Sequence, residues 1–250
     1  MSIYITGDTH GNFNRFSKKK INKLSFILKE QDTLIICGDV GLLWCYDKEY
    51  EYNIKWLGSL PFKIIFVPGN HDNYNMIKDF ELVDWCGGKA RHIVQDKIMI
   101  LERGQIYNIE NKTLFTFGGA QSHDIEGGIL DRNDEYFHLK KKKLKRNKLN
   151  FRILNESWWK EELPSQEEIE SAWKNLEKVK FNVDYIITHC CSEIIQQKMG
   201  VNESNILTQF FNNIENSITF KHWYFGHYHK NQEIDSKHTV CYDTIIKIGD

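Results

Sequence analysis

Side chains suited to binding metal ions lie in five short motifs spread along the chain. Glycines stand before most of them, which lets the backbone turn sharply and approach closely. Two aspartates, one asparagine and four histidines, without a thiolate, suit Mn²⁺, Fe, Zn²⁺ or Ni²⁺ better than Ca²⁺. They exceed the roughly three protein ligands of a single catalytic site and fit two ions about 3.5–4 Å apart that share a carboxylate. The motifs are Gly7-Asp8-Thr9-His10-Gly11, Gly38-Asp39, Gly69-Asn70-His71-Asp72, Thr188-His189 and Gly226-His227-Tyr228-His229.

Each motif follows or completes a predicted strand. Apolar runs predict strands at residues 2–6, 33–37, 62–67, 183–188 and 219–225. Apolar residues near helical spacing predict helices over 13–29 and 47–57. This β-α-β-α-β order favours a largely parallel sheet with helices outside it. Loops at the carboxyl ends of such strands converge on one crevice, so the motifs can meet although they span more than 200 residues.

The rest of the chain is expected to elaborate the same domain. Segments 90–94, 97–101, 105–109 and 113–117 are short and β-rich, which predicts a meander. A capping box of Ser165 with Glu168 predicts the start of a helix, and 239–248 is predicted as a late strand. Because no linker rich in Ser, Gly or Pro divides the chain, residues 1–250 are predicted as a single domain with a polar, lysine-rich insertion at about 128–154.

The insertion contains seven basic residues in the nine from Lys140 to Lys148. They would form either a contact for phosphate or nucleic acid, weakened steeply by salt, or a solvated mobile loop, as charge runs usually do. The loop is the favoured interpretation. Trp158 and Trp159 could stack on a base, but packing of these large aromatics onto the core is favoured.

The composition is typical of a folded chain. With 250 residues, 41% hydrophobic and 27% charged, disorder is excluded. The balance of 33 basic and 34 acidic residues argues against a generally basic nucleic-acid binder. No 18-residue run lacks charges, so no membrane span is predicted, and no secretory signal is visible at the start. Six cysteines, mostly in apolar runs, suit reduced thiols and a cytoplasmic location.

The ordered set D-x-H, G-D, G-N-H-D, T-H and G-H-x-H resembles the calcineurin-like metallophosphoesterase superfamily over nearly the whole chain. The resemblance implies an α/β fold with a two-sheet β-sandwich core flanked by helices, four layers in all. It implies that His71 lies beside the substrate phosphate, where it stabilises the developing charge or protonates the leaving oxygen. It also implies two metal sites that share Asp39, one formed by Asp8, His10, Asp39 and His229, the other by Asp39, Asn70, His189 and His227.

Two positions depart from the patterns of relatives. Leu42 stands where many of them place an Asp or His that supports the catalytic histidine, so His71 lacks its usual partner. The G-N-H motif ends in Asp72, and no arginine closely follows Gly38-Asp39. Both features argue against the protein Ser/Thr phosphatase branch.

A finer resemblance, to small bacterial and phage metallophosphoesterases, lies in G-G-A-x-S-x-D at residues 118–124 and S-W-W-x-x-E at 157–162. In those relatives an arginine often follows the aspartate by four positions. Gly128 stands there in this chain, and Arg132 is a candidate replacement. The candidate substrate contacts are Asn12, Trp44, His123 and Arg132.

These residues favour a metal-dependent phosphoric ester hydrolase in which hydroxide held by two ions attacks phosphorus directly. The ions are expected to be Mn²⁺, with Fe, Zn²⁺ or Ni²⁺ as alternatives. The expected substrate is a phosphodiester or another small organic phosphate. The alternatives are a phosphomonoesterase, a nuclease and a non-catalytic scaffold that keeps the fold. Nucleic acid is not the favoured partner, and no membrane partner is expected.

Overall fold

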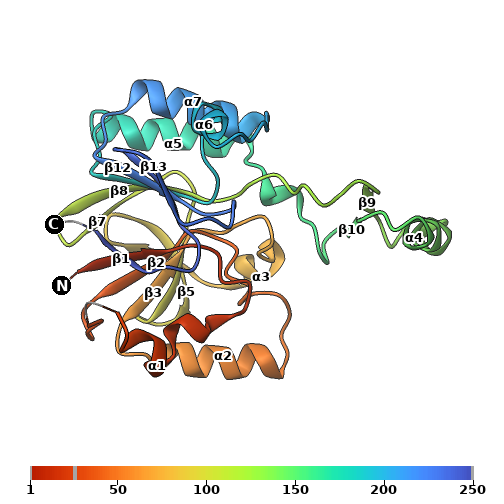
Figure 1. The fold of residues 1–250 in the computed structure, drawn as a ribbon, viewed down its shortest axis with the longest axis horizontal. Helices are drawn as coiled ribbons and strands as arrows, with labels where there is room; N and C mark the ends of the chain where they lie inside the picture. The colour runs from red at the N-terminus through yellow and green to blue at the C-terminus, as the bar shows by residue number, and fades with distance from the viewer. Residues whose placement is uncertain (1, 25–26, 249–250) are drawn as a thin grey trace.

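The computed structural model describes residues 2–24 and 27–248 and contains two sheets packed face to face (Figure 1). In the first sheet, β1, β2, β3 and β6 are parallel, while β15, β5 and β4 add antiparallel edges. Its strands, in spatial order, are β15 (Ile246–Ile248), β1 (Ile3–Thr6), β2 (Thr33–Ile36), β3 (Lys63–Phe66), β6 (Ile98–Leu101), β5 (Gly88–Val94) and β4 (Leu82–Trp85).

The second sheet has a parallel centre of β8, β11, β12 and β14, with β7 and β13 as antiparallel edges. Its strands, in spatial order, are β13 (Gln232–Asp235), β14 (His238–Val240), β12 (His222–Phe225), β11 (Tyr185–Thr188), β8 (Lys112–Phe117) and β7 (Gln105–Ile109).

Helices cover the outer face of each sheet (Figure 1). The first sheet packs against a 3₁₀ turn η1 (Phe13–Phe16), α1 (Lys18–Ile21), α2 (Lys48–Gly58) and α3 (Tyr74–Asp79). The second sheet packs against α5 (Gln166–Lys178), α6 (Glu193–Lys198) and α7 (Ile206–Ser217), and a second 3₁₀ turn, η2 (Lys160–Glu162), precedes α5. The predicted two-sheet core flanked by helices is confirmed.

Alternation along the central strands explains the three apolar layers between these elements. In β2, Leu34 and Ile36 face the helices, whereas Ile35 faces the second sheet. Ile187 of β11 faces back from that sheet, while Ile186 packs on its own helices. Strands covered on both faces are mostly apolar, and β1, β2, β3 and β11 each have a polar residue only at one end, which explains why their sequences predict strands.

The helix expected over 13–29 is wrong. Residues 13–16 form a 3₁₀ turn, and Ser17 then takes an extended backbone conformation with φ −62° and ψ 145°. Helix α1 covers only Lys18–Ile21, and residues 25–26 of the expected helix lie outside the described residues. The side chain of Asn12 accepts a hydrogen bond from the backbone of Asn14, and such local capping favours a short turn over a continued helix.

The expected meander and late strand are also corrected. Strands β5 and β6 form a hairpin in the first sheet, but β7 and β8 form a hairpin in the second. Segment 239–248 is likewise divided between β14 in one sheet and β15 in the other. In both places a short connection carries the chain across the sandwich, which a local apolar pattern does not reveal.

Residues 126–156, called the arm from here on, project from the body with α4 at the tip (Figure 1). The arm contains β9 (Ile129–Leu130), α4 (Phe137–Arg146) and β10 (Arg152–Ile153), and β9 pairs with β10 in parallel. The prediction of a loop for Lys140–Lys148 is therefore wrong for the residues up to Arg146, which are helical. Lysine, leucine and arginine are good helix formers, and basic residues in the last turn stabilise the helix dipole. No helix within the described ranges has the length and apolar character to cross a bilayer.

Candidate metal centre

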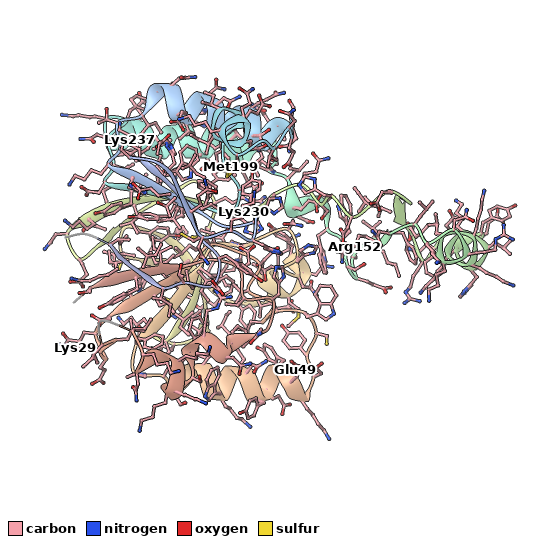
Figure 2. The ribbon with its side chains drawn as sticks, in the orientation of Figure 1. Lys29, Glu49, Arg152, Met199, Lys230 and Lys237 are labelled. Atoms are coloured by element: carbon pink, nitrogen blue, oxygen red, sulfur yellow. The ribbon has the colours of Figure 1, made fainter. Side chains whose placement is uncertain are left out.

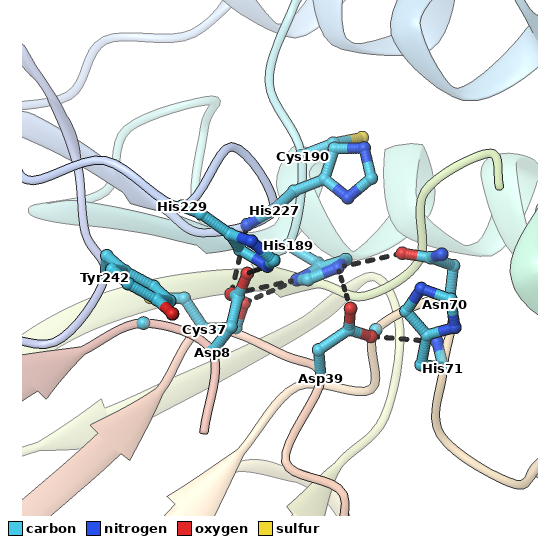
Figure 3. Close-up of polar contacts among 12 residues, drawn as sticks. Asp8, Cys37, Asp39, Asn70, His71, His189, Cys190, His227, His229 and Tyr242 are labelled. Atoms are coloured by element: carbon cyan, nitrogen blue, oxygen red, sulfur yellow. Dashed lines mark hydrogen bonds and ion pairs between the residues drawn. The ribbon is translucent and has the colours of Figure 1, made fainter. Parts of the chain in front are cut away.

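The loops after the parallel strands of both sheets bring the seven candidate ligands together at the carboxyl ends of those strands. Figure 3 shows Asp8, Asp39, Asn70, His189, His227 and His229. Strands β1, β2 and β3 lead into the loops of Asp8, Asp39 and Asn70, and β11 and β12 lead into those of His189 and His227. Backbone hydrogen bonds join the loops: the amides of Thr9 and His10 both donate to the carbonyl oxygen of Asp39.

One half of this cluster consists of Asp8, His10 and His229. The Nε2 atoms of His10 and His229 lie 2.9 Å apart, and His229 Nε2 lies 3.1 Å from Asp8 Oδ2. That Oδ2 is buried and accepts no hydrogen bond within the described part of the chain. Tyr242 stacks on the His229 ring, with centroids 4.9 Å apart. Three donor atoms that face one another in this way fit a cation of the Mn²⁺ or Zn²⁺ kind.

The other half is buried and consists of Asp39, Asn70 and His189. His189 Nδ1 donates to the carbonyl oxygen of Cys37 at 2.7 Å, which turns Nε2 toward Asn70 Oδ1 at 3.1 Å and Asp39 Oδ2 at 3.4 Å. The Asn70 amide is oriented by its NH₂ group, which donates to Ser122 Oγ at 3.1 Å. His227 adjoins this half, with its ring centroid 5.1 Å from that of His189.

Asp39 lies between the two halves. Its Oδ1 accepts a hydrogen bond from the backbone N–H of His71 at 2.8 Å. Its Oδ2 lies 3.4 Å from His189 Nε2 on one side and 3.9 Å from His10 Nε2 on the other. One carboxylate oxygen therefore faces ligands of both halves.

The electrostatics of the cluster favour positive charge. Burial alone would lower the pKa of His189, but the charge and hydrogen bond of Asp39, the charge of Asp8 and the hydrogen bond to Cys37 together outweigh it and raise the pKa to about 9. Burial would raise the pKa of Asp39, but the charge and hydrogen bond of His189 hold it well below its usual value. A place that stabilises an imidazolium between two buried carboxylates also suits a divalent cation.

The backbone around the centre is strained. His10, Asp39, His227 and His229 all have positive φ, between 44° and 68°. Such left-handed conformations cost a non-glycine residue on the order of 1–2 kcal/mol, and they cluster where function requires a particular geometry. Gly226 is needed for a different reason: a Cβ there would lie 2.3 Å from Asp8 Oδ1.

Two further residues support the ligands. Asp72, fully buried, accepts hydrogen bonds from the amides of Gly69 and Gly41, which joins the loops after β3 and β2. Burial and the charge of Asp39 raise the pKa of Asp72 to about 6. The guanidinium of Arg15 donates to the carbonyl oxygens of Gly7 and Asp8 and so stabilises the loop after β1. Sequence reasoning noted Asp72 only as a departure from relatives and missed Arg15, which follows Asp8 by seven residues.

A cavity of about 450 Å³ opens beside the centre and is lined by His10, His71, Trp44, Tyr50 and Arg152, among others. Burial lowers the pKa of His71, Arg152 lowers it further, and Asp39 opposes both. Leu42, at the position where relatives place a supporting Asp or His, is buried and also lines this cavity.

Arg152 is a second residue that the sequence analysis missed. It lies where the arm meets the body (Figure 2), and its guanidinium pairs with both carboxylate oxygens of Asp124. In the arm, Arg152 is in register with Ile129, and its amide donates to the carbonyl oxygen of Gly128. The strand that neighbours Gly128 thus carries an arginine of its own.

The remaining substrate candidates lie in different places. Trp44 lines the cavity and packs edge-on against Trp159, with ring centroids 5.9 Å apart. Trp159 is fully buried, so its predicted packing onto the core is confirmed. His123 contacts His227 beside the centre. Asn12 lines a second cavity with Arg15 and Tyr242 instead. Arg132 pairs with Glu156 on the exposed arm, so neither Asn12 nor Arg132 is among the residues that line the cavity at His71.

The family model of calcineurin-like phosphoesterases matches residues 1–231. The chain therefore belongs to the calcineurin-like phosphoesterase family. Members of this family generally bind divalent metal ions, and Asp8, His10 and His229 form a group able to hold one.

Two particular proteins are similar to the chain. An uncharacterized protein of Acanthamoeba polyphaga mimivirus is 28% identical over 123 residues, which cover 46% of this chain and 41% of that protein. The chain thus matches about two fifths of the length of this relative. Among solved structures, the phosphopantetheinyl hydrolase of Mycobacterium tuberculosis aligns over 96% of this chain and 88% of its own, with 14% identity and a TM-score of 0.41.

Proposed function

We propose that the chain hydrolyses phosphodiesters or other small organic phosphates with the help of two divalent ions, expected to be Mn²⁺, that share Asp39. The observation that carries this proposal is the position of Asp39 Oδ2 between His10 Nε2 at 3.9 Å and His189 Nε2 at 3.4 Å. Asp8, His10 and His229 would hold one ion, and Asn70, His189 and His227 the other. When bound, such a pair neutralises phosphate charge and acidifies a water nucleophile.

Arg152 would hold the phosphate group. Its guanidinium is anchored by Asp124 and lines the cavity beside His71. An arginine in a fixed orientation donates two parallel hydrogen bonds to a phosphate, which gives both attraction and orientation.

His71 would protonate the leaving oxygen. Burial and Arg152 lower its pKa, but a bound phosphate beside it would raise the pKa again, because an anion favours the imidazolium. The substrate would thus help to supply the proton that its leaving group needs. General acids of this kind contribute about 10²–10⁴-fold to the rate.

The shape of the cavity supports an organic leaving group. Its volume of about 450 Å³ lies in the range of small-molecule sites. Trp44 and Tyr50 supply apolar walls, and Asn53 and Asp47 supply polar groups. Inorganic phosphate alone would leave most of this space unused, which favours substrates with a sizeable second substituent.

Hydrolysis of bis-p-nitrophenyl phosphate and p-nitrophenyl phosphate, measured side by side, tests the proposal. The protein would be stripped of metal and assayed with and without Mn²⁺, with Asp39→Asn as the blank. Mn²⁺-dependent cleavage that favours the diester is the expected result. Preference for the monoester would indicate the phosphomonoesterase instead. Absence of turnover on either substrate, with ions still bound, would indicate a scaffold or a more selective enzyme.

A nuclease is the second candidate, favoured by the basic surface of α4. Lys140, Lys142, Lys143, Lys145 and Arg146 belong to this projecting helix, and the arm also carries Arg152 to the cavity. Retention on immobilised single-stranded DNA at low salt, lost at high salt, would support this candidate. Equal elution of the wild type and a variant with Lys142, Lys143 and Lys145 changed to Glu would exclude a role for α4.

A further inference from the structure

His123, Glu203 and His227 form a second cluster of potential ligands beside the proposed dinuclear centre. They come from three separate loops: the one after β8, the one before α7 and the one after β12. The Nε2 atoms of His123 and His227 lie 3.2 Å apart, and Glu203 Oε2 lies 3.4 Å from His123 Nε2. Neither His123 nor Glu203 is needed for the two ions proposed above.

Glu203 has an unusual environment for a carboxylate. Its side chain is only 5% exposed. Oε1 accepts a hydrogen bond from the Asn205 amide at 2.7 Å, and the backbone N–H of Glu203 donates to Gln196 Oε1 at 3.0 Å. Oε2, in contrast, is buried without a hydrogen-bond partner among the residues that the structure describes. It faces the two histidines, and a buried carboxylate oxygen in this position is stabilised by a cation, either a protonated His123 or a bound metal ion.

The distances fit a metal ion better than a chain of hydrogen bonds. Charged N–H···O contacts are normally about 2.7–2.9 Å long, shorter than the 3.4 Å between His123 and Glu203. His123 Nε2 can carry only one proton, so it cannot accept from His227 and donate to Glu203 at the same time. Zinc ligands at about 2.0–2.1 Å in tetrahedral geometry lie roughly 3.3–3.4 Å from one another, which is close to both observed separations.

We propose that His123, Glu203 and His227 bind a third divalent cation, for which Zn²⁺ is the best match. Two imidazoles and one carboxylate are a known catalytic zinc set that leaves a fourth position for water or substrate. His123 is 57% exposed, so the fourth position would face solvent. His227 would contribute Nε2 to this site and its other nitrogen to the dinuclear centre, which requires the ring to lose its N–H proton to solvent and act as a bridging imidazolate. This site goes beyond the proposed function, since it adds an ion that the hydrolysis itself does not require.

The number of ions bound by the full chain tests this site. Metal-stripped protein would be saturated with Zn²⁺, desalted and examined by elemental analysis. We expect Glu203→Gln to bind one ion fewer than the wild type, because the amide keeps the hydrogen bond with Asn205 but loses the negative charge. Glu193→Gln is the matched control: this carboxylate accepts hydrogen bonds from Thr208 and Asn212, so its removal should leave the ion count unchanged.

A second variant separates this site from the dinuclear centre. Asp39→Asn should release the shared pair and retain the ion at Glu203, whereas Asp39→Asn with Glu203→Gln should retain none. Co²⁺ provides an independent signal, because tetrahedral cobalt absorbs visible light far more strongly than octahedral cobalt. This absorption should persist in Asp39→Asn and disappear in Glu203→Gln. Equal ion counts and equal cobalt spectra for the wild type and Glu203→Gln would overturn the third site without affecting the other two.

Discussion

The two halves of the candidate metal centre differ in their access to solvent. In the half formed with Asp8, the side chains of His10 and His229 are 36% and 49% exposed. In the other half, Asn70 and His189 are buried. We therefore expect an ion in the exposed half to exchange readily, and an ion in the buried half to exchange only when the loops open. One centre can thus combine a retained ion with a replaceable one.

The halves also differ in how their ligands are positioned. His189 is oriented by the Cys37 carbonyl oxygen, and Asn70 by Ser122. In the exposed half, the Nε2 atoms of His10 and His229 lie against other proposed ligands, namely each other, Asp8 and Asp39, rather than against a separate orienting group. Hydrogen bonds that orient ligands normally raise metal affinity, which again indicates tighter binding in the buried half.

Asp39→Asn should remove ion binding from both halves, because both halves depend on this carboxylate. We expect loss of both shared ions and of measurable hydrolysis, checked by elemental analysis and by the diester assay. Asp84→Asn serves as the control, since Asp84 pairs with Lys89 on the edge strands β4 and β5 and does not line the cavity. Unchanged metal content in Asp39→Asn would contradict the shared position of this residue.

His71→Ala should leave both halves loaded and reduce turnover by about 10²–10⁴-fold, as expected for loss of a general acid. The reduction should be largest for an alkyl leaving group, which needs a proton, and smaller for p-nitrophenolate. Steady-state kinetics on the two kinds of substrate would show the difference. Equal losses on both would assign His71 to stabilising charge on the phosphate instead.

His229→Gln and His189→Gln compare the halves directly. Each should weaken ion binding by at least roughly tenfold, the scale on which even supporting residues of metal sites act. Excess Mn²⁺ should restore activity in His229→Gln but not in His189→Gln. Because the second change also leaves the buried Cys37 carbonyl without its donor, it should lower the free energy of unfolding by about 1–3 kcal/mol, measured in chelator. Equal rescue of both variants would contradict the distinction between the halves.

Arg152→Ala should have the smallest effect, and one confined to substrate. A hydrogen bond to a charged group is worth about 1.5 kcal/mol or more, so we expect a loss of roughly tenfold or more in kcat/KM with unchanged metal content. Arg132→Ala is the matched control on the same arm, because its guanidinium pairs with Glu156. A comparable loss of kcat/KM in Arg132→Ala would indicate that Arg132, rather than Arg152, contacts the phosphate.

The sequence was most informative about the centre itself. Short runs such as 33–37 are apolar after the initial threonine, so they could be recognised as strands buried on both faces. Parallel order then implied that Asp8, Asp39 and Asn70 end at one edge. The structure brings these side chains together as expected.

The failures at the meander and at the late strand share one physical cause, which is that sheet membership depends on distant partners. Segment 239–248 is apolar enough for one strand, yet Tyr242 donates to Asn231 Oδ1 in the connection between β14 and β15. The expected helix over 13–29 has suitable spacing, but the extended backbone of Ser17 interrupts it. Arg152 could not be found from spacing, because it is brought to Gly128 by strands on opposite sides of α4.

The span of the proposed ligands, from Asp8 to His229, has a consequence for how the protein withstands unfolding. Because each half draws residues from both sheets or from distant loops, no fragment of the chain can bind the ions as the whole does. Metal binding is then linked to global rather than local unfolding. Free metal at one hundred times its dissociation constant would add about 2.7 kcal/mol per site to the stability of the folded state. Hydrogen exchange in the strands of both sheets should therefore slow together when metal is added. The supply of metal in the cell would then also affect the lifetime of the folded protein.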